Sequence, residues 1–333
     1  MSTRRSRYAV DADDLRKSYP TGRGKPPVVA LDGLGFAVEA GTVHGLLGPN
    51  GAGKSTTVKI LSTLSRADGG SASVAGVDVR TDPDAVRRRI GLVSQKPSSD
   101  PMATGRENLV LAARIQGLNR SDAGDRAAWL LDRFRIADAA DRLVRTWSGG
   151  MARKLDVAIG LVHRPEVLFL DEPTTGLDPE ARAEMWREVG RMTGDDQMTV
   201  LLTTHYLDEA DHLAHRLAIV DHGRVAVEGS PEQLKSELRG DVLQVGLEDE
   251  AAAARACPLV AGVAGLSAVV QDGSTVRARS EAGARVVPAV FGILSDAGLP
   301  VVSATVARPS LDDVYLRHAG RSFDATALEA MAS

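Results

Sequence analysis

The sequence contains one cysteine, Cys257, in 333 residues. A single cysteine excludes both a disulfide framework and a cysteine-rich zinc or iron–sulfur site. The sequence also lacks any run of roughly 18 apolar residues, the length that marks a membrane-spanning helix. Its charge is nearly balanced, with 40 Lys and Arg against 44 Asp and Glu, which excludes the strongly basic face that captures nucleic acid. We therefore expect a soluble protein that stays inside the cell and has no nucleic-acid partner.

Lysine is absent after Lys235, and the character of the sequence changes close to this point. Before it, glycine-punctuated segments alternate between strand and helix patterns, which predicts an α/β fold. From Val242 onward the pattern predicts strand, helix, strand, strand, helix, strand and helix, which is a small α+β domain. We therefore expect one domain over residues 1–238 and a second over residues 239–333.

A glycine-rich segment matches the phosphate-loop pattern G-x-x-x-x-G-K-S/T. A predicted strand, Thr42–Leu47, precedes it, and a predicted helix begins at Lys54. The glycines let backbone N–H groups surround a β-phosphate, Lys54 brings a positive charge to the β- and γ-oxygens, and Ser55 offers its hydroxyl to Mg²⁺. The alternative is an ordinary glycine-rich turn between strand and helix. The residues assigned to the nucleotide are Gly48, Pro49, Asn50, Gly51, Ala52, Gly53, Lys54, Ser55 and Thr56.

Two carboxylates, Asp171 and Glu172, follow the continuous apolar run Val167–Leu170, which is typical of a parallel strand buried on both faces. Ligands bind beyond the carboxyl ends of such strands. We expect Asp171 to hold Mg²⁺ through its water shell and Glu172 to act as the general base on the attacking water. A carboxylate at the metal is neutralised by it and is a poor base, so the second one must take that role. The alternative is that both residues only cap the segment that begins at Pro173.

A second glycine-rich helix start is formed by Ser148, Gly149 and Gly150, before a predicted helix over Ala152–Val162. Ser148 is a good N-cap, and the two glycines expose the backbone, so this is a second candidate anion site. One nucleotide needs only one phosphate loop. We therefore expect this site to bind the γ-phosphate of a nucleotide held by another subunit, the alternative being an ordinary N-cap.

Together these motifs resemble the nucleotide-binding domain of ABC transporters over residues 8–230. The resemblance implies an α/β fold of the P-loop NTPase type, with a RecA-like core, an antiparallel β subdomain and a helical signature subdomain, followed by the small C-terminal α+β domain. It further implies that ATP is bound with Mg²⁺ and hydrolysed, with Lys54, Glu172 and His205 as catalytic residues. Tyr19 would stack on adenine, Gln95 would approach Mg²⁺ or water, Asp178 would belong to the D-loop, and His205 would contact the γ-phosphate.

A closer resemblance, to ATP-binding subunits of the daunorubicin/doxorubicin-resistance type, runs nearly from end to end. It is carried by the segments Trp147–Asp156, Thr203–Ala210, Asp221–Arg224 and Pro309–Val314. The resemblance implies a peripheral subunit on the cytoplasmic face of the cell membrane that powers export of a drug or antibiotic-like compound. Its partners would be a separate transmembrane permease subunit and, when ATP is bound, a second copy of itself. Trp147 and Met151 depart from the family's commonest signature, Leu-Ser-Gly-Gly-Gln.

Two other functions stay open at this point: a soluble ABC-type ATPase of translation or DNA repair, and a regulatory nucleotide sensor. Proteins of the first kind are expected to carry two cassettes, long insertions or zinc cysteines, and this chain has one cassette and one cysteine. Helical periodicity over residues 104–117 and 122–135 places Leu109, Leu130 and Leu131 in the core. We also expect Trp129 and Phe134 to be core residues and Cys257 to be buried.

Overall fold

The computed structural model describes residues 8–22, 25–194, 196–238, 240–281 and 283–319. The chain folds as two compact units, the first extending to Pro231 and the second beginning at Glu232. The domain boundary expected between residues 238 and 239 stays a prediction, and residue 239 lies outside the described residues.

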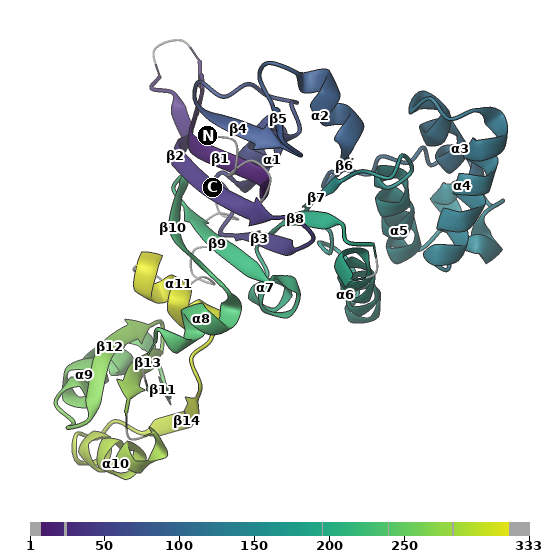
Figure 1. The fold of residues 1–333 in the computed structure, drawn as a ribbon. Coiled ribbons are helices and arrows are strands. Elements are labelled where there is room, and N and C mark those ends of the chain that lie inside the picture. The colour runs from purple at the N-terminus through teal and green to yellow at the C-terminus, as the bar shows by residue number, and fades with distance from the viewer. Residues whose placement is uncertain (1–7, 23–24, 195, 239, 282, 320–333) are drawn as a thin grey trace. The chain divides into compact units, whose positions relative to one another are not determined.

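A six-stranded sheet forms the centre of the first unit, with the strand order β10-β9-β3-β8-β7-β6 (Figure 1). The five strands from β9 to β6 are parallel, and β10 pairs with β9 in the antiparallel sense. Every residue of β3, β7 and β8 is buried, as the uninterrupted apolar runs predict for central parallel strands. The strands are β3 (Val43–Leu47), β6 (Ile90–Val93), β7 (Val167–Asp171), β8 (Thr199–Thr204), β9 (Arg216–Asp221) and β10 (Arg224–Gly229).

The first unit also contains an antiparallel sheet, in the strand order β2-β1-β4-β5. One hydrophobic core joins it to the six-stranded sheet and surrounds helix α1 (Lys54–Leu61), with Val10, Val58 and Phe169 among its fully buried members. Helix α2 (Pro83–Arg89) adds Val86 to this core. The strands are β1 (Tyr8–Tyr19), β2 (Val28–Glu39), β4 (Gly69–Val74) and β5 (Val77–Asp78).

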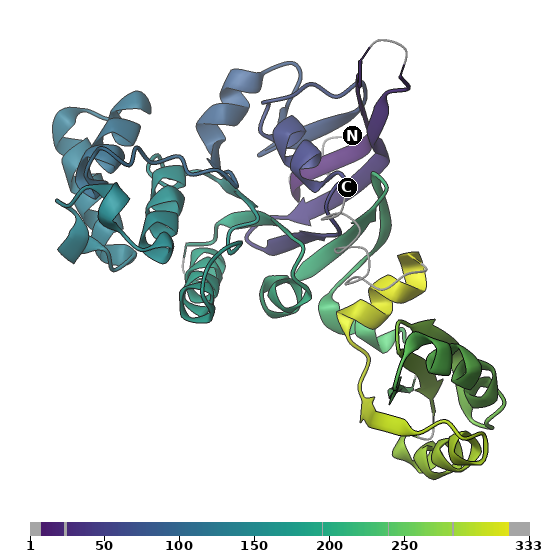
Figure 2. The ribbon, with the colours of Figure 1, turned by 180° about the vertical axis from the view of Figure 1, so that it is seen from behind.

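A helical subdomain lies between β6 and β7 in the sequence and is seen from behind in Figure 2. It contains α3 (Gly105–Ile115), α4 (Arg120–Arg133) and α5 (Gly149–Gly160), with short 3-10 turns at Ala137–Ala139 and Val144–Thr146. The predicted core residues Leu109, Leu130, Leu131 and Phe134 are buried in it. Helices α6 (Pro179–Gly194) and α7 (Leu207–Leu213) follow β7 and β8.

The prediction that Trp129 is a core residue is wrong, because its side chain is 46% exposed. On α4, Ala127, Leu130 and Leu131 face the core, and Trp129 lies off that face. Its indole instead packs under two guanidinium groups, with Arg126 at 4.4 Å and Arg133 at 5.4 Å from the ring centroid. Cation–π attraction therefore stabilises an aromatic residue that remains accessible to water.

The second unit contains a four-stranded antiparallel sheet in the order β12-β13-β11-β14. Its elements follow the predicted succession, and this βαββαβ arrangement is of the ferredoxin-like kind. Cys257 packs at the edge of the core and is half-buried, not buried as expected. The elements are β11 (Asp241–Leu247), α9 (Glu250–Ala261), β12 (Leu266–Asp272), β13 (Thr275–Ser280), α10 (Val287–Asp296), β14 (Val301–Ala307) and α11 (Leu311–Ala319), preceded by α8 (Pro231–Ser236).

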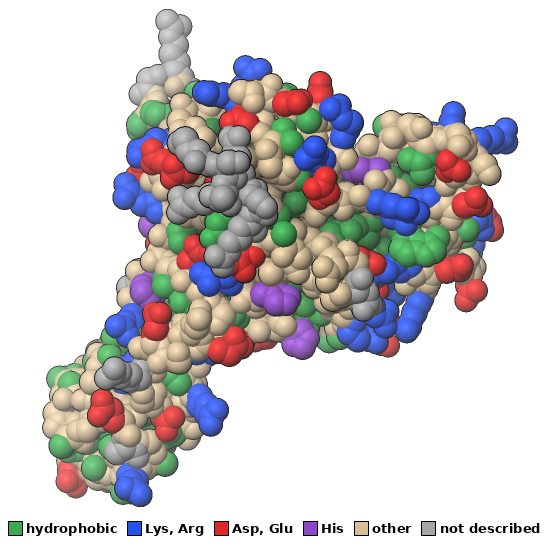
Figure 3. All heavy atoms as spheres, in the orientation of Figure 1, with side chains coloured by type: hydrophobic (Ala, Val, Ile, Leu, Met, Phe, Trp, Pro, Cys, Tyr) green, Lys and Arg blue, Asp and Glu red, His purple; other side chains and the backbone are tan. Residues whose placement is uncertain are grey.

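Within the described part of the chain, no helix combines the length and the apolarity that crossing a membrane requires. On the face of the molecule shown in Figure 3, basic and acidic side chains are interspersed over the first unit.

Candidate functional site

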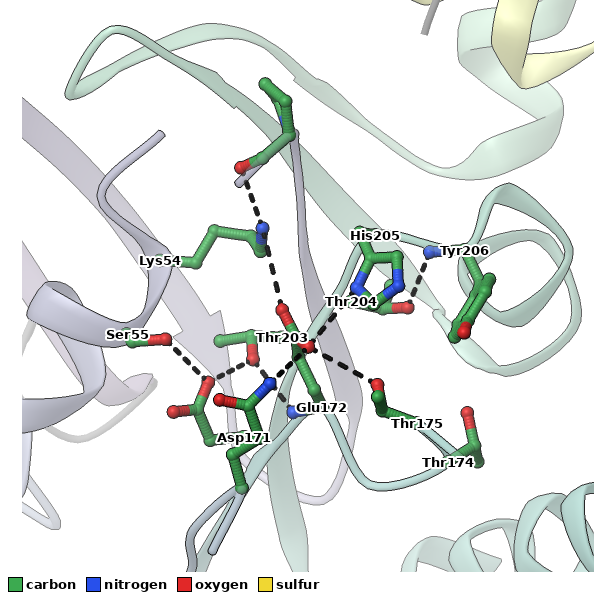
Figure 4. Close-up of polar contacts among 12 residues, drawn as sticks. Lys54, Ser55, Asp171, Glu172, Thr174, Thr175, Thr203, Thr204, His205 and Tyr206 are labelled. Atoms are coloured by element: carbon green, nitrogen blue, oxygen red, sulfur yellow. Dashed lines mark hydrogen bonds and ion pairs between the residues drawn. The ribbon is translucent and has the colours of Figure 1, made fainter. Parts of the chain in front are cut away.

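The three predicted catalytic residues, Lys54, Glu172 and His205, lie at one edge of the six-stranded sheet, where the parallel strands end (Figure 4). The register of the sheet pairs Asp171, the last residue of β7, with Thr203 of β8, and pairs Leu47 of β3 with Thr204. Parallel strands end at the same edge, so the segments that follow these residues are brought together. The sequence prediction placed the site there, and the geometry shows how its parts meet.

The phosphate loop connects β3 to α1, and its first helical amides have no side-chain cap. The N-cap is Gly53, whose φ of 110° is accessible to glycine but strained for other residues. Lys54 is 4% exposed, and its Nζ donates to the carbonyls of Gly48 at 2.6 Å and Pro49 at 3.0 Å. Uncapped amides beside a buried ammonium group form an anion site.

Burial lowers the pKa of Lys54 to about 8, although the carboxylates of Glu172 and Asp171 act in the opposite direction. At neutral pH the ammonium form therefore still predominates. A phosphate group arriving in the loop would add negative charge and stabilise this form further.

A turn between β9 and β10 supports the phosphate loop from outside. The N–H of Gly223 donates to the Ala52 carbonyl at 3.0 Å, and its own carbonyl accepts from the Asp32 N–H at 3.0 Å. Gly223 has a φ of +74°, and a Cβ atom there would lie 2.7 Å from the Ala30 carbonyl oxygen. Only glycine fits between the loop and β2, which gives the Asp221–Arg224 segment a physical role in holding the loop.

Two hydroxyl groups converge on one carboxylate oxygen at the sheet edge. Ser55 Oγ donates to Asp171 Oδ1 at 3.1 Å, and Thr203 Oγ1 donates to the same atom at 2.6 Å. A serine hydroxyl beside a carboxylate is the hard oxygen set that suits Mg²⁺, which keeps several waters and takes further ligands from phosphates. The described residues hold no cluster of three or more His, Cys, Asp or Glu side chains able to bind a metal by themselves.

Thr203 was not among the predicted site residues. The feature of the sequence that could have pointed to Thr203 is its position at the end of the predicted strand over residues 200–203. The parallel register of β7 and β8, which the sequence alone does not supply, sets it beside Asp171.

The carboxylate of Glu172 lies at the centre of the site. Its Oε2 accepts from Gln95 Nε2 at 3.0 Å and from Thr175 Oγ1 at 3.3 Å, and His205 Nδ1 lies 3.2 Å away without hydrogen-bond alignment. Oε1 lies 4.0 Å from Lys54 Nζ. The structure therefore brings three separately predicted residues, Lys54, Gln95 and His205, to the one expected to be the base.

The backbone of Glu172 is strained, with a φ of +49° in the left-handed region. Its N–H is held by the carbonyl and the hydroxyl of Thr203, each at 3.1 Å. Strained backbone that neighbouring contacts hold in place is concentrated at functional sites. The side chain of Glu172 points toward Lys54 at the end of the phosphate loop (Figure 4).

Burial raises the pKa of Glu172, but the contact with His205, the charge of Lys54 and the hydrogen bond from Thr175 together hold it below its ordinary value. Glu172 is therefore ionised at neutral pH. This is the protonation state that a general base requires before the reaction.

Other predicted residues have their described contacts close to them in the sequence. Tyr19 is 36% exposed, with Lys17 Nζ 5.5 Å from its ring centroid. Ser148 Oγ caps its own helix by accepting the N–H of Met151 at 3.3 Å, and Gly149 is exposed. Asp178 accepts the N–H of Ala181 at 2.8 Å at the start of α6. The structure does not gather these residues at Glu172, so their roles in nucleotide binding stay predictions.

Comparison with known proteins gives the family. Residues 31–175 match the ABC transporter family. The chain is 45% identical over 324 residues to the daunorubicin/doxorubicin resistance ATP-binding protein DrrA of Streptomyces peucetius, covering 97% of this chain and 96% of that protein. It is 42% identical to the Nod factor export ATP-binding protein I of Burkholderia thailandensis, covering 71% of this chain and 76% of the relative.

Among solved structures, the fold is similar to cbiO1 of Clostridium perfringens, part of the ABC transporter complex cbiONQ. The TM-score is 0.63 at 26% identity, covering 69% of this chain and 92% of that one. This similarity confirms the predicted P-loop NTPase fold. The 97% coverage in the comparison with DrrA confirms the resemblance to ATP-binding subunits of the daunorubicin/doxorubicin-resistance type. The chain belongs to the ABC transporter family as an ATP-binding subunit, an ATPase, of the daunorubicin/doxorubicin-resistance type.

Proposed function

We propose that this chain hydrolyses ATP to power export of a drug or antibiotic-like compound through a separate transmembrane permease, at the cytoplasmic face of the cell membrane. The observation that carries the catalytic part is the contact of the buried Glu172 carboxylate with Gln95, Thr175 and His205. The names of the relatives, which refer to resistance to daunorubicin and doxorubicin and to Nod factor export, support the transport part.

Glu172 would act as the general base. As the water oxygen bonds to the γ-phosphorus, the carboxylate takes the water proton, and the bond from that phosphorus to the β–γ bridging oxygen breaks. The products are ADP and inorganic phosphate, and Glu172 finally releases the proton to the phosphate. Gln95 and His205, both in contact with the carboxylate, would orient the water, and Lys54 would stabilise the charge on the phosphate oxygens.

Magnesium fits the oxygen atoms of Ser55 and Asp171, and when bound it would neutralise charge on the β- and γ-phosphates. Thr203 would hold the Asp171 carboxylate in the orientation that this requires. Tyr19 would stack on adenine, and the remaining residues from Gly48 to Thr56 would surround the phosphates.

Ser148, Gly149 and Gly150 would bind the γ-phosphate of a nucleotide held by a second copy of the chain, with Asp178 of the D-loop nearby. Each nucleotide would then lie between the phosphate loop of one subunit and the α5 start of the other. We assign the ATPase domain to residues 1–238 and an accessory domain to residues 239–333.

Purified protein tests the base assignment through the variant Glu172→Gln, which keeps the shape of the side chain. We expect kcat to fall by about 10²–10⁴-fold, the usual contribution of a general base, while ATP still binds. Wild-type turnover in this variant would contradict the assignment. Drug accumulation in cells that express the subunit with its membrane partner tests the transport part. Unchanged accumulation in these cells would favour the soluble regulatory ATPase.

A further inference from the structure

Arg153 lies on α5, close to its N-terminus, and is 9% exposed. Its guanidinium group donates to four backbone carbonyls on two other segments. Nε binds Pro173 O at 2.9 Å, Nη1 binds Ser94 O at 2.7 Å, and Nη2 lies 3.3 Å from both Asp171 O and Glu172 O. One side chain thus holds the backbone before Gln95 and the backbone that carries Glu172.

The chemistry of arginine suits this position. The guanidinium group is planar, carries five N–H donors in fixed directions and stays charged in proteins. Burial lowers the pKa of Arg153, and the carboxylates of Asp156, Asp171 and Glu209 act against this effect. A buried charge is costly unless its hydrogen bonds are made, so the four carbonyls must stay in place around it. This makes the contact rigid.

A second residue of α5, Asp156, binds the segment that contains Gln95. Asp156 Oδ1 accepts the N–H of Ser98 at 2.9 Å and of Ser99 at 3.0 Å. The segment that contains Gln95 is therefore held to α5 at both ends, at residue 94 by Arg153 and at residues 98 and 99 by Asp156. Any displacement of α5 relative to the sheet must move this segment, or break these bonds.

We propose that Arg153 is a positioning residue that makes the alignment of Glu172 and Gln95 depend on the position of α5. This deepens the proposed function and rests on it, because Ser148 at the start of α5 would contact ATP held by the second copy. The helix that meets the nucleotide of the partner subunit is then the helix that holds the base of its own subunit. Arg153 therefore couples the two ATP sites of the dimer.

The proposal predicts a separation of binding from turnover. The hydrogen bonds of Arg153 go to the backbone at residues 94 and 171–173 and not to the phosphate loop, so we expect its loss to leave ATP affinity unchanged. The reaction depends on Glu172 being placed correctly, and misplacement of about 1 Å can cost roughly 100-fold in rate. Arg153→Met is therefore expected to lower kcat by about 10–100-fold and to reduce cooperativity in ATP concentration, with a Kd for ATP within about twofold of wild type.

Arg126 supplies a matched control. Its guanidinium group also donates to backbone carbonyls of the helical subdomain, Leu161 O at 2.7 Å and Val162 O at 3.1 Å, at the other end of α5. Arg126→Met removes two hydrogen bonds of the same kind, against four for Arg153, and the contact with Trp129, without touching the site. It is expected to lower the melting temperature and to leave kcat and the Kd for ATP unchanged.

The experiment measures Kd for ATP, kcat, KM, the Hill coefficient and melting temperature for wild type, Arg153→Met, Arg153→Lys and Arg126→Met in the full chain with Mg²⁺. Arg153→Lys keeps the charge and part of the hydrogen bonding, so its kcat should be intermediate, and it serves also if Arg153→Met fails to fold. The proposal is overturned if both Arg153 variants hydrolyse ATP as the Arg126 variant does, or if they lose ATP binding in parallel with kcat. A wild-type protein that does not hydrolyse ATP would instead overturn the proposed function.

Discussion

The two glycine-rich helix starts of this chain, at α1 and at α5, have opposite surroundings. At α1, Lys54 is 4% exposed, and the loop before it is packed against the β9–β10 turn through Gly223. At α5, Ser148 and Gly149 are exposed, and a Cβ atom at Gly149 would meet nothing within 4 Å. The capping differs as well, because α1 begins at a glycine without a side-chain cap whereas Ser148 caps α5.

We infer from this contrast that the chain completes one of the two proposed phosphate sites and leaves the other open. At α1, the same chain supplies the buried Lys54 ammonium group and the Asp171 carboxylate that we propose to hold Mg²⁺. At the start of α5, in the part of the chain that the structure describes, Ser148 and Gly149 are exposed. A second copy, placed so that its nucleotide meets α5, would supply what is missing, and the following predictions test each side of the comparison.

The largest effect is expected at α1. Lys54→Ala removes a charge that would bind two phosphate oxygens, and charge-assisted hydrogen bonds contribute about 1.5–3 kcal/mol each. The affinity for ATP should fall by about 100-fold or more. Titration calorimetry with ATP and Mg²⁺ measures this. Lys59→Ala, an exposed lysine on the same helix, is the control and should bind as wild type does.

At α5 the comparison predicts loss of turnover without loss of binding. Gly149→Ala adds a methyl group that meets no atom of the chain, so folding and ATP affinity should be unchanged. The methyl group would stand where the phosphate of the second copy approaches, and kcat should fall by roughly tenfold or more. Gly124→Ala on α4, also without a neighbour within 4 Å, is the control. Normal turnover in Gly149→Ala would remove the reason to place a nucleotide at α5.

Low pH should destabilise the fold on the α1 side through His44. This residue lies on β3, the strand that leads into the phosphate loop. Burial, with a smaller contribution from Arg216, lowers the pKa of His44 to about 3. The unfolded chain takes up this proton near its ordinary pKa of about 6.5, so stability is complete above that pH and falls as the pH decreases toward 3. At pH 5 the loss is about 2 kcal/mol. Urea unfolding at pH 7.5 and pH 5 should show a smaller decrease for His44→Leu, and an equal decrease would contradict the assignment.

A smaller effect is expected where the β9–β10 turn supports the loop. Gly223→Ala forces a Cβ atom against the Ala30 carbonyl, whereas Gly76→Ala has nearly the same φ, +76° against +74°, and open space. Both variants carry the same backbone strain, so the difference between their ATP affinities measures the effect of the contact with the Ala30 carbonyl. ATP affinity should fall by about tenfold, or 1.4 kcal/mol, for Gly223→Ala and remain unchanged for Gly76→Ala. Equal affinities would show that the turn does not hold the loop.

Much of the catalytic edge was predictable because its residues belong to short local motifs. The spacing from Gly48 to Ser55, and the pair Asp171 and Glu172 after an apolar run, predict which strand ends would carry the chemistry, and the structure brings these strand ends together. Thr203 and Arg153 were not assigned roles, since their contacts depend on strand register and on which helix meets which loop. The sequence pattern shows that a residue belongs to a strand or helix, but not which carbonyl it reaches.

The rest of the fold shows the same difference between what local sequence patterns predict and what depends on packing. The succession of strands and helices in the second unit follows from periodicity and was predicted correctly. Trp129 in the first unit was assigned to the core, but its position off the apolar face of α4 leaves its side chain exposed.

The most direct test of the half-site account is the oligomeric state of Glu172→Gln with saturating ATP and Mg²⁺, measured by analytical ultracentrifugation. We expect a dimer with ATP, a monomer without it, and loss of the dimer when Gly149→Ala is added. A chain that remains monomeric in saturating nucleotide, with or without its membrane partner, would contradict the account.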